Sequence, residues 1–302
     1  MSRLAATKPV EAVPDALAAL ELLKPITWFP PMWAFGCGIA SATGSHSTPW
    51  LLVVLGIVLC GPLVCGTSQA VNDWYDRHVD AINEPNRPIP SGRIPGRWGL
   101  YIAIGWTLLS VLASLPLGTF GVGATLVGLA LAWAYSAPPA RLKRNGWWGN
   151  SAVAICYEGL PWVTGVTVIT GAVPDWHVFV FAGLYSLGCH GIMTLNDFKS
   201  IAGDRRMGVG SLPARLGPEV AARVACWVMA VPQVIVVGLL VAWGQPRYAI
   251  AVTVVLAVQL LLMRRLLTNP RELAPWYNGT GITLYVSGMM MCGFALRSII
   301  PG

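Results

Sequence analysis

The feature that most constrains this chain is a series of apolar runs without charge, the longest extending from Trp98 to Ala140. At about 1.5 Å of rise per residue, about 20 apolar residues cross the hydrocarbon core of a bilayer. The longest run is therefore long enough for two spans, with a turn at 116–118. Hydrophobic residues make up 55% of the chain and charged residues only 11%, which excludes an ordinary soluble domain.

These runs predict an all-α membrane protein of nine transmembrane helices. The predicted spans are 26–44, 50–71, 98–116, 119–136, 150–171, 177–196, 222–242, 246–265 and 278–298. Residues 1–24 are expected to form a cytoplasmic N-terminal segment, and residues 25–302 a single nine-helix domain around a central cavity. A short helix on the membrane surface is predicted within the N-terminal segment from Ala16, Leu17, Leu20 and Leu23.

The basic residues favour this topology, because cytoplasmic loops of membrane proteins carry an excess of Lys and Arg. With the N-terminus inside, nine spans place all of the 20 basic residues except Arg247 and Arg297 on the cytoplasmic side. The net charge of +7 would suggest a nucleic-acid partner for a soluble protein. In a membrane protein the placement of charges matters more than their sum, and no nucleic-acid partner is expected.

A polar stretch from Asn72 to Arg93 follows one of these apolar runs directly. Its aspartates Asp73, Asp76 and Asp80 are spaced i, i+3, i+7, so they share one face if the preceding helix continues. Carboxylates gathered in this way repel one another unless a cation lies between them, and hard divalent cations prefer such ligands. Prolines after Glu84 end the helix, and the following loop can fold back. The arginines expected to bind phosphate are Arg77, Arg87 and Arg93.

A second acidic stretch, from Asn196 to Gly208, begins with the same Asn-Asp pair 124 residues later. It has two aspartates spaced i, i+7, and basic residues next to them: Asp197, Asp204, Lys199, Arg205 and Arg206. The similarity predicts two related four-helix halves, about 25–140 and 145–270, plus a ninth helix, with the two acidic loops face to face. Two such stretches on one side of a membrane indicate a polyphosphate bound through divalent metal. A third cytoplasmic stretch offers further phosphate contacts: Tyr135, Ser136, Arg141 and Lys143.

The first acidic stretch resembles the aspartate motif NDxxDxxxD of the UbiA superfamily of intramembrane prenyltransferases, and the resemblance covers nearly the whole chain. The segments NRPIPSGR (86–93) and NDFKSIAGDR (196–205) are similar to the chlorophyll and bacteriochlorophyll synthases of that family. Ser200 stands where many members have a third aspartate, which leaves open how many protein ligands a second metal has.

The resemblance implies esterification of a chlorophyllide or bacteriochlorophyllide propionate by geranylgeranyl or phytyl diphosphate, with Mg²⁺ as cofactor. The implied Mg²⁺ ligands are Asn72, Asp76, Asp80, Asp197 and Asp204, and the implied catalytic residues are these aspartates and Asp73. Asn196 is expected to contact substrate. The implied location is a bacterial cytoplasmic or photosynthetic membrane with the active site on the cytoplasmic side. The implied partners are the bilayer, the two substrates, and other pigment-biosynthesis or photosystem-assembly proteins.

Two further residues are candidates for substrate contact. Glu158 is the only acidic residue inside a predicted span, and ionisable residues within membranes are expected to be functional. We expect it to contact the chlorin head group, because it is distant in sequence from both acidic stretches. His190 lies seven residues before Asp197, on the same helical face. It is a candidate ligand for the chlorin magnesium, and a histidine satisfied by an interhelical hydrogen bond is the alternative.

Other functional classes remain open at this point. A secondary transporter with a charged cytoplasmic vestibule is the alternative from a different class, although transporters hold their coupling charges near the midplane. Within the enzymes, the alternative is prenylation of a quinone or haem precursor. The short N-terminal extension favours bacteriochlorophyllide over chlorophyllide as acceptor.

Overall fold

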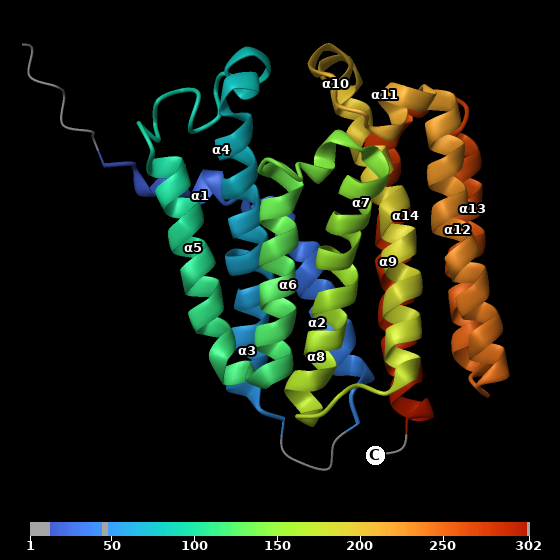
Figure 1. Ribbon diagram of the computed structural model, residues 1–302. Coiled ribbons are helices and arrows are strands. Elements are labelled where there is room, and N and C mark those ends of the chain that lie inside the picture. The colour runs from blue at the N-terminus through green and yellow to red at the C-terminus, as the bar shows by residue number, and fades with distance from the viewer. Residues whose placement is uncertain (1–12, 44–47, 301–302) are drawn as a thin grey trace, which may run out of the picture.

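The computed structural model describes residues 13–43 and 48–300, and every regular element there is a helix apart from one isolated β-bridge between Asn145 and Gly210. The all-α prediction is confirmed. The long helices run side by side through one bundle (Figure 1). The α-helices are α1 (Ala16–Leu22), α2 (Phe29–Ser41), α3 (Trp50–Val58), α4 (Gly66–Asn83), α5 (Trp98–Ser114), α6 (Gly118–Ser136), α7 (Gly146–Ala154), α8 (Leu160–Thr170), α9 (Trp176–Asn196), α10 (Ile201–Met207), α11 (Leu212–Leu216), α12 (Pro218–Ala242), α13 (Pro246–Leu266) and α14 (Pro270–Ile299).

Short π-helical and 3₁₀ segments interrupt or join these helices. Two are π-helical and lie inside longer helices: η2 (Leu59–Cys65) joins α3 to α4, and η5 (Ile155–Gly159) joins α7 to α8. The 3₁₀ segments are η1 (Pro25–Thr27), η3 (Leu115–Leu117), η4 (Leu142–Arg144) and η6 (Asp197–Ser200).

Seven helical stretches among the described residues are long and apolar enough to cross a membrane, which supports the predicted membrane protein. One of them, Trp98–Ser136, has 39 residues, but the chain reverses at η3, where Gly118 has a φ of +74°. As a result α5 and α6 lie side by side (Figure 1). The helix α2 has only 13 residues. The count of nine spans and the division into two related halves therefore stay predictions.

Glycine allows α2 and α8 to approach closely. A Cβ atom on Gly38 would lie 2.1 Å from the carbonyl oxygen of Trp162, and one on Gly165 would lie 2.3 Å from that of Phe35. The hydrophobic effect does not draw helices together inside a lipid bilayer, so membrane helices associate through close packing, and small residues allow that packing. These close contacts hold α2 against α8.

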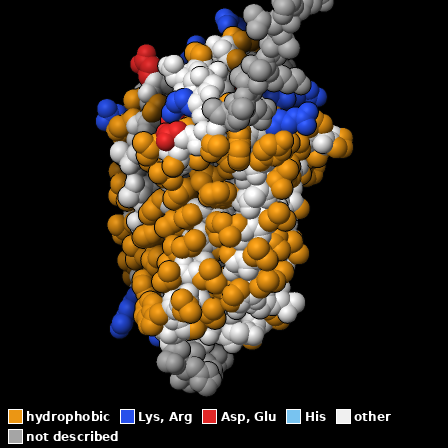
Figure 2. All heavy atoms as spheres, turned by 90° about the vertical axis from the view of Figure 1, so that its left-hand side faces the viewer, with side chains coloured by type: hydrophobic (Ala, Val, Ile, Leu, Met, Phe, Trp, Pro, Cys, Tyr) orange, Lys and Arg blue, Asp and Glu red, His pale blue; other side chains and the backbone are white. Residues whose placement is uncertain are grey.

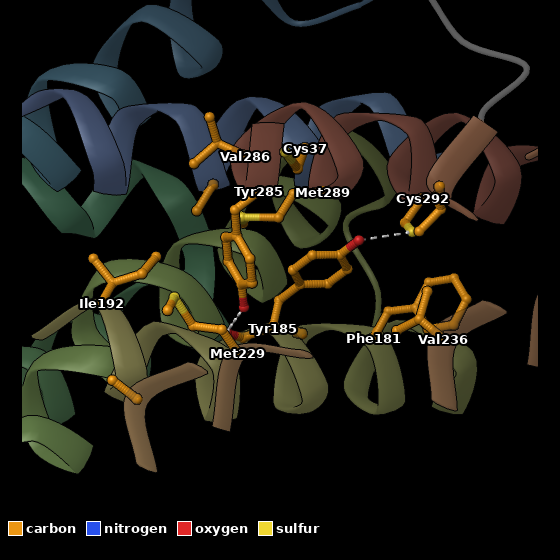
Figure 3. Packing of buried hydrophobic residues seen from close by; sticks show 14 of the residues in the cluster. Cys37, Phe181, Tyr185, Ile192, Met229, Val236, Tyr285, Val286, Met289 and Cys292 are labelled. Atoms are coloured by element: carbon orange, nitrogen blue, oxygen red, sulfur yellow. Dashed lines mark hydrogen bonds between the residues drawn. The ribbon is translucent and has the colours of Figure 1, made fainter. Parts of the chain in front are cut away.

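A dense core joins α9, α12 and α14 (Figure 3). The hydroxyl of Tyr285 donates to the carbonyl oxygen of Tyr185 at 2.5 Å, and the Tyr185 hydroxyl contacts Cys292 Sγ at 3.3 Å. Met229 of α12 packs into the same cluster. The core holds α9 in place, and α9 leads directly into the second acidic stretch.

The two acidic stretches lie at the same end of the bundle, as predicted (Figure 1, top). Figure 2 shows a broad hydrophobic band on the side covered by α5, with charged side chains gathered mainly above it. The predicted N-terminal helix is confirmed as α1, which buries Ala18 and Leu22 and exposes Leu17 and Leu20. Residues 1–12 of the predicted N-terminal segment lie outside the described residues, and the orientation in the membrane stays a prediction.

Candidate active site

The helix α4 is continuous from Gly66 to Asn83, which confirms that Asp73, Asp76 and Asp80 belong to one helix face. The chain leaves the helix at Glu84, immediately before the prolines. The loop then folds back as predicted: Arg87 Nη1 lies 2.9 Å from Asp80 Oδ2 and 3.3 Å from Asp73 Oδ1. One guanidinium group therefore bridges two carboxylates of the motif.

Asp73 is the most buried of the three carboxylates, at 1% exposed. Lys24 Nζ donates to its Oδ1 at 2.6 Å, whereas its Oδ2 has no hydrogen-bond partner among the described residues. Lys24 lies just after α1 with a φ of +48°, and it reaches the site from 49 residues away in the chain. The sequence analysis counted Lys24 only as a cytoplasmic charge, since nothing in its local pattern indicates this partner.

Asp76 is surrounded by donors from two segments. Its Oδ2 accepts from Lys143 Nζ at 2.5 Å and from Asn72 Nδ2 at 3.1 Å, and its Oδ1 lies 3.5 Å from Arg141 Nη2. Asn72 also donates to Ser136 Oγ at 3.2 Å. Burial lowers the pKa of Lys143, and the facing Asp76 carboxylate opposes that shift. The structure thus brings the third cytoplasmic stretch onto the first acidic stretch.

Hydroxyl and amide groups surround the carboxylates of the second stretch. Asn150 Nδ2 lies 3.4 Å from Asp197 Oδ2, while Asp204 Oδ2 accepts from Ser200 Oγ at 2.9 Å and from Ser211 Oγ at 2.5 Å. Ser200 therefore acts as a donor to Asp204 within this cluster.

Another amide partner of the second stretch comes from α14, where Asn278 Nδ2 donates to Asn196 Oδ1 at 2.6 Å. Asn278, Asn150 and Ser211 are not among the site residues that the sequence predicted. A polar residue within an apolar run was the only available signal for Asn150, and the other two had none.

The two clusters approach one another. The half-buried Tyr135 lies close enough to both stretches for the charges of Asp197, Asp76 and Asp204 to act on its hydroxyl. The segment after α9 also approaches the end of α4, because a Cβ on Gly203 would lie 3.4 Å from Asn83 Nδ2. The two stretches therefore lie near one another, and a single site made from both stays a prediction.

Several predicted phosphate-binding residues have partners outside the two clusters. Arg77 Nη1 donates to the carbonyl oxygen of Trp74 and its guanidinium covers the Trp74 ring, with Cζ 4.0 Å from the centroid. Arg93 pairs with Glu21 of α1, and its hydrogen bonds hold the pKa of that carboxyl below its usual value. The remaining two residues are exposed: Lys199, and Arg205, whose Nε donates to the Ala214 carbonyl oxygen. Their contact with substrate stays a prediction.

Glu158 and His190 are both buried, at 2% and 5% exposed. Glu158 lies in the π-helical turn η5, and its Oε2 has no partner among the described residues. The imidazole of His190 stacks near Trp147, with ring centroids 5.1 Å apart, and neither ring nitrogen has a partner in the described part of the chain. A contact of His190 with the chlorin magnesium and a histidine satisfied by an interhelical hydrogen bond both stay predictions.

The donor set fits Mg²⁺ by its chemistry, because carboxylate and amide oxygens are the ligands that this ion takes. Among residues 13–43 and 48–300, no three His, Cys, Asp or Glu side chains converge as a group able to hold a metal ion. The reason is geometric: the three aspartates of α4 are spread over about 10 Å of helix, and each is paired with basic side chains. Asp73 Oδ2 is buried and has no hydrogen-bond partner among the described residues, so the basic side chains do not occupy every acceptor atom of the motif.

The chain belongs to the UbiA prenyltransferase family, whose pattern matches residues 29–279. It therefore belongs to a class of transferases, and the transporter alternative is set aside. Solved structures share the fold: a UbiA homolog from Archaeoglobus fulgidus bound to DMAPP and Mg²⁺ superposes with a TM-score of 0.71, at 19% identity over 94% of this chain and 100% of that chain.

Relatives with higher identity narrow the class further. The chain is 58% identical to the bacteriochlorophyll synthase 33 kDa chain of Cereibacter sphaeroides, over 95% of both chains. It is 44% identical to the bacteriochlorophyll synthase 34 kDa chain of Chloroflexus aurantiacus, over 93% of this chain and 90% of that one. The chloroplastic chlorophyll synthase of Arabidopsis thaliana is more distant, at 38% over 91% of this chain and 73% of the relative.

Proposed function

We propose that this chain transfers a prenyl group from a prenyl diphosphate to the propionate of bacteriochlorophyllide, which gives the ester and releases diphosphate. The observation that carries the proposal is the similarity to bacteriochlorophyll synthase chains along almost the entire sequence. The greater distance from the chlorophyll synthases favours the bacteriochlorin acceptor over chlorophyllide. The donor is geranylgeranyl or phytyl diphosphate.

The reaction requires no nucleophile from the protein, because the propionate of the acceptor is itself the nucleophile. A propionate carboxylate has a pKa of about 4 and is already ionised at neutral pH. One of its oxygens forms a bond to the allylic C1 of the donor, while the bond from C1 to the diphosphate oxygen breaks and diphosphate leaves with the electron pair. The protein must hold both substrates in line and stabilise the charge that develops on the leaving group.

The basic residues of the site suit that second task. Lys143, Arg141 and Arg87 now pair with carboxylates, and each can donate instead to diphosphate oxygens. Mg²⁺, when bound, would supply further neutralisation of the leaving diphosphate. The residues proposed to hold it are Asn72, Asp76, Asp80, Asp197 and Asp204, and Asp73 supports Asp80 through the shared Arg87.

The acceptor side is proposed to involve Glu158 and His190. Both are buried in the membrane-spanning part of the bundle and retain unpartnered polar atoms. An uncompensated carboxyl inside a membrane is costly, so a contact to the chlorin would offset that cost. The apolar surroundings also exclude water that would otherwise capture the carbocation-like C1.

The test is to incubate membranes that contain the protein with each combination of chlorin acid and prenyl diphosphate, and to separate the products by chromatography. The proposal expects a Mg²⁺-dependent prenyl ester of bacteriochlorophyllide, formed faster than the ester of chlorophyllide. Prenylation of a quinone or haem precursor in place of both chlorin acids would contradict it.

A further inference from the structure

The π-helical turn η5 directs two consecutive side chains to different neighbours. Glu158 lies beside Cys189 of α9, whereas Tyr157 reaches in the direction of α4. A π-helical turn inserts an extra residue into a helix, and such turns occur frequently at functional sites. Tyr157 is half-buried, so part of its side chain remains accessible.

The Tyr157 hydroxyl contacts two polar groups, one on α4 and one at the end of η2. Gln69 Nε2 of α4 lies 3.4 Å away, and Cys65 Sγ lies 3.5 Å away. Cys65 is the last residue of η2, so the two π-helical segments meet at this hydroxyl. Cys65 Sγ donates to the Thr27 carbonyl oxygen at 3.3 Å, so its sulfur is left as an acceptor for the hydrogen of Tyr157, and sulfur is a weak acceptor. A phenol in this state is prepared to donate to an anion.

The position of Gln69 places this hydroxyl relative to the acidic site. Gln69 precedes Asn72 by three residues and Asp76 by seven on one continuous helix, so all three share a face. The rise of the helix puts Gln69 about 10 Å deeper in the bundle than Asp76. A diphosphate held by Lys143 and Arg141 at the level of Asp76 would direct its apolar prenyl chain into the apolar bundle, which would place the allylic C1 on the inner side of the phosphates, towards Gln69 and Tyr157.

We propose that the Tyr157 hydroxyl binds and positions the carboxylate of the acceptor, an inference that rests on the proposed function. Tyr157 donates its hydrogen to one carboxylate oxygen while the other oxygen forms the bond to C1. The carbon–oxygen bond to diphosphate breaks in that step, and Tyr157 keeps its proton throughout. Gln69 and Cys65 fix the direction of the hydroxyl, and Tyr157 therefore selects acceptors that carry a free carboxylate.

The test compares how tightly detergent-solubilised protein binds bacteriochlorophyllide and its propionate methyl ester, followed by quenching of tryptophan fluorescence. The wild-type protein prefers the acid. Tyr157→Phe keeps the ring and removes the donor, so the preference for the acid falls by about tenfold or more, because a hydrogen bond to a charged group contributes about 1.5–3 kcal/mol. The KM for the acid rises, and the KM for the prenyl diphosphate does not.

The matched control is Tyr185→Phe, since the Tyr185 hydroxyl also contacts a cysteine sulfur but lies in the core of α9, α12 and α14. This control keeps the preference for the acid. Unchanged affinity for the methyl ester shows that a variant is folded. If Tyr157→Phe does not fold, Gln69→Leu replaces it, and the preference must fall there too.

The outcomes separate the two claims. A wild-type protein that binds neither the acid nor the ester contradicts the proposed function itself. If the wild-type protein prefers the acid and the Tyr157→Phe or Gln69→Leu variant prefers it equally, the role of Tyr157 is overturned. The proposed function then stays intact.

Discussion

Replacement of Lys143 by methionine tests the diphosphate site most sharply. Lys143 is 10% exposed and its Nζ lies 2.5 Å from Asp76 Oδ2, so it is held at the carboxylate most closely surrounded by donors. Methionine keeps most of the aliphatic length and removes the charge. Loss of one preorganised donor to charge that develops in the transition state costs about 2.7–4 kcal/mol, or about 10²–10³ in kcat.

Arg141 Nη2 lies 3.5 Å from the same carboxylate and can take over part of this role. We therefore expect kcat to fall by the smaller of these amounts, about 100-fold. The assay is the initial rate of ester formation at saturating chlorin acid, with the prenyl diphosphate varied so that kcat and KM are obtained separately. Arg144→Met is the matched control, because Arg144 is the next residue and is exposed. A Lys143→Met variant whose kcat/KM stays within about threefold of that control would refute the reasoning.

Three further predictions test the remaining parts of the site. Asp76→Ala and Asp80→Ala should each abolish transfer while the protein stays inserted, and turnover above about a tenth of wild type in both, at saturating Mg²⁺, would remove the metal role from this motif. Asp197→Asn should impair activity more than Ser200→Ala, because a carboxylate binds Mg²⁺ better than a hydroxyl; the reverse order in the same rate assay would give Ser200 a direct role. Glu158→Gln should raise the KM for the chlorin acid and leave that for the prenyl diphosphate unchanged, and an equal rise in both would place Glu158 at the diphosphate.

Local sequence patterns predicted the parts of the site that depend on one helix or one loop. The spacing of the aspartates on α4 predicted their common face, and the prolines after Glu84 predicted the loop that returns Arg87 to Asp80. Both follow from helix periodicity and from the missing N–H of proline, which act over a few residues.

Contacts between distant segments were beyond such patterns. Lys24 meets Asp73 across 49 residues, and Asn278 meets Asn196 across 82. The sequence also does not distinguish Arg87, which joins the cluster, from Arg77, which lies on Trp74. That difference depends on the direction in which each side chain leaves the backbone.

The helix irregularities were also not predictable. Nothing in the apolar run around Tyr157 indicates that η5 is π-helical, although this turn separates the directions of Tyr157 and Glu158. Hydropathy also could not settle the number of spans, since α2 is short, although the turn between α5 and α6 lies where the sequence predicted it. Helix ends and turns inside such runs depend on packing between helices.

The most direct test of the central claim is which bond breaks. Bacteriochlorophyllide labelled with ¹⁸O in both propionate oxygens is incubated with the protein, Mg²⁺ and prenyl diphosphate, and the ester and the diphosphate are analysed by mass spectrometry. Attack of the propionate on C1 predicts an ester that keeps both labels and a diphosphate that carries none. An ester that has lost one label, with ¹⁸O in the released diphosphate, would show activation of the carboxyl group instead and would contradict prenyl transfer to the carboxylate.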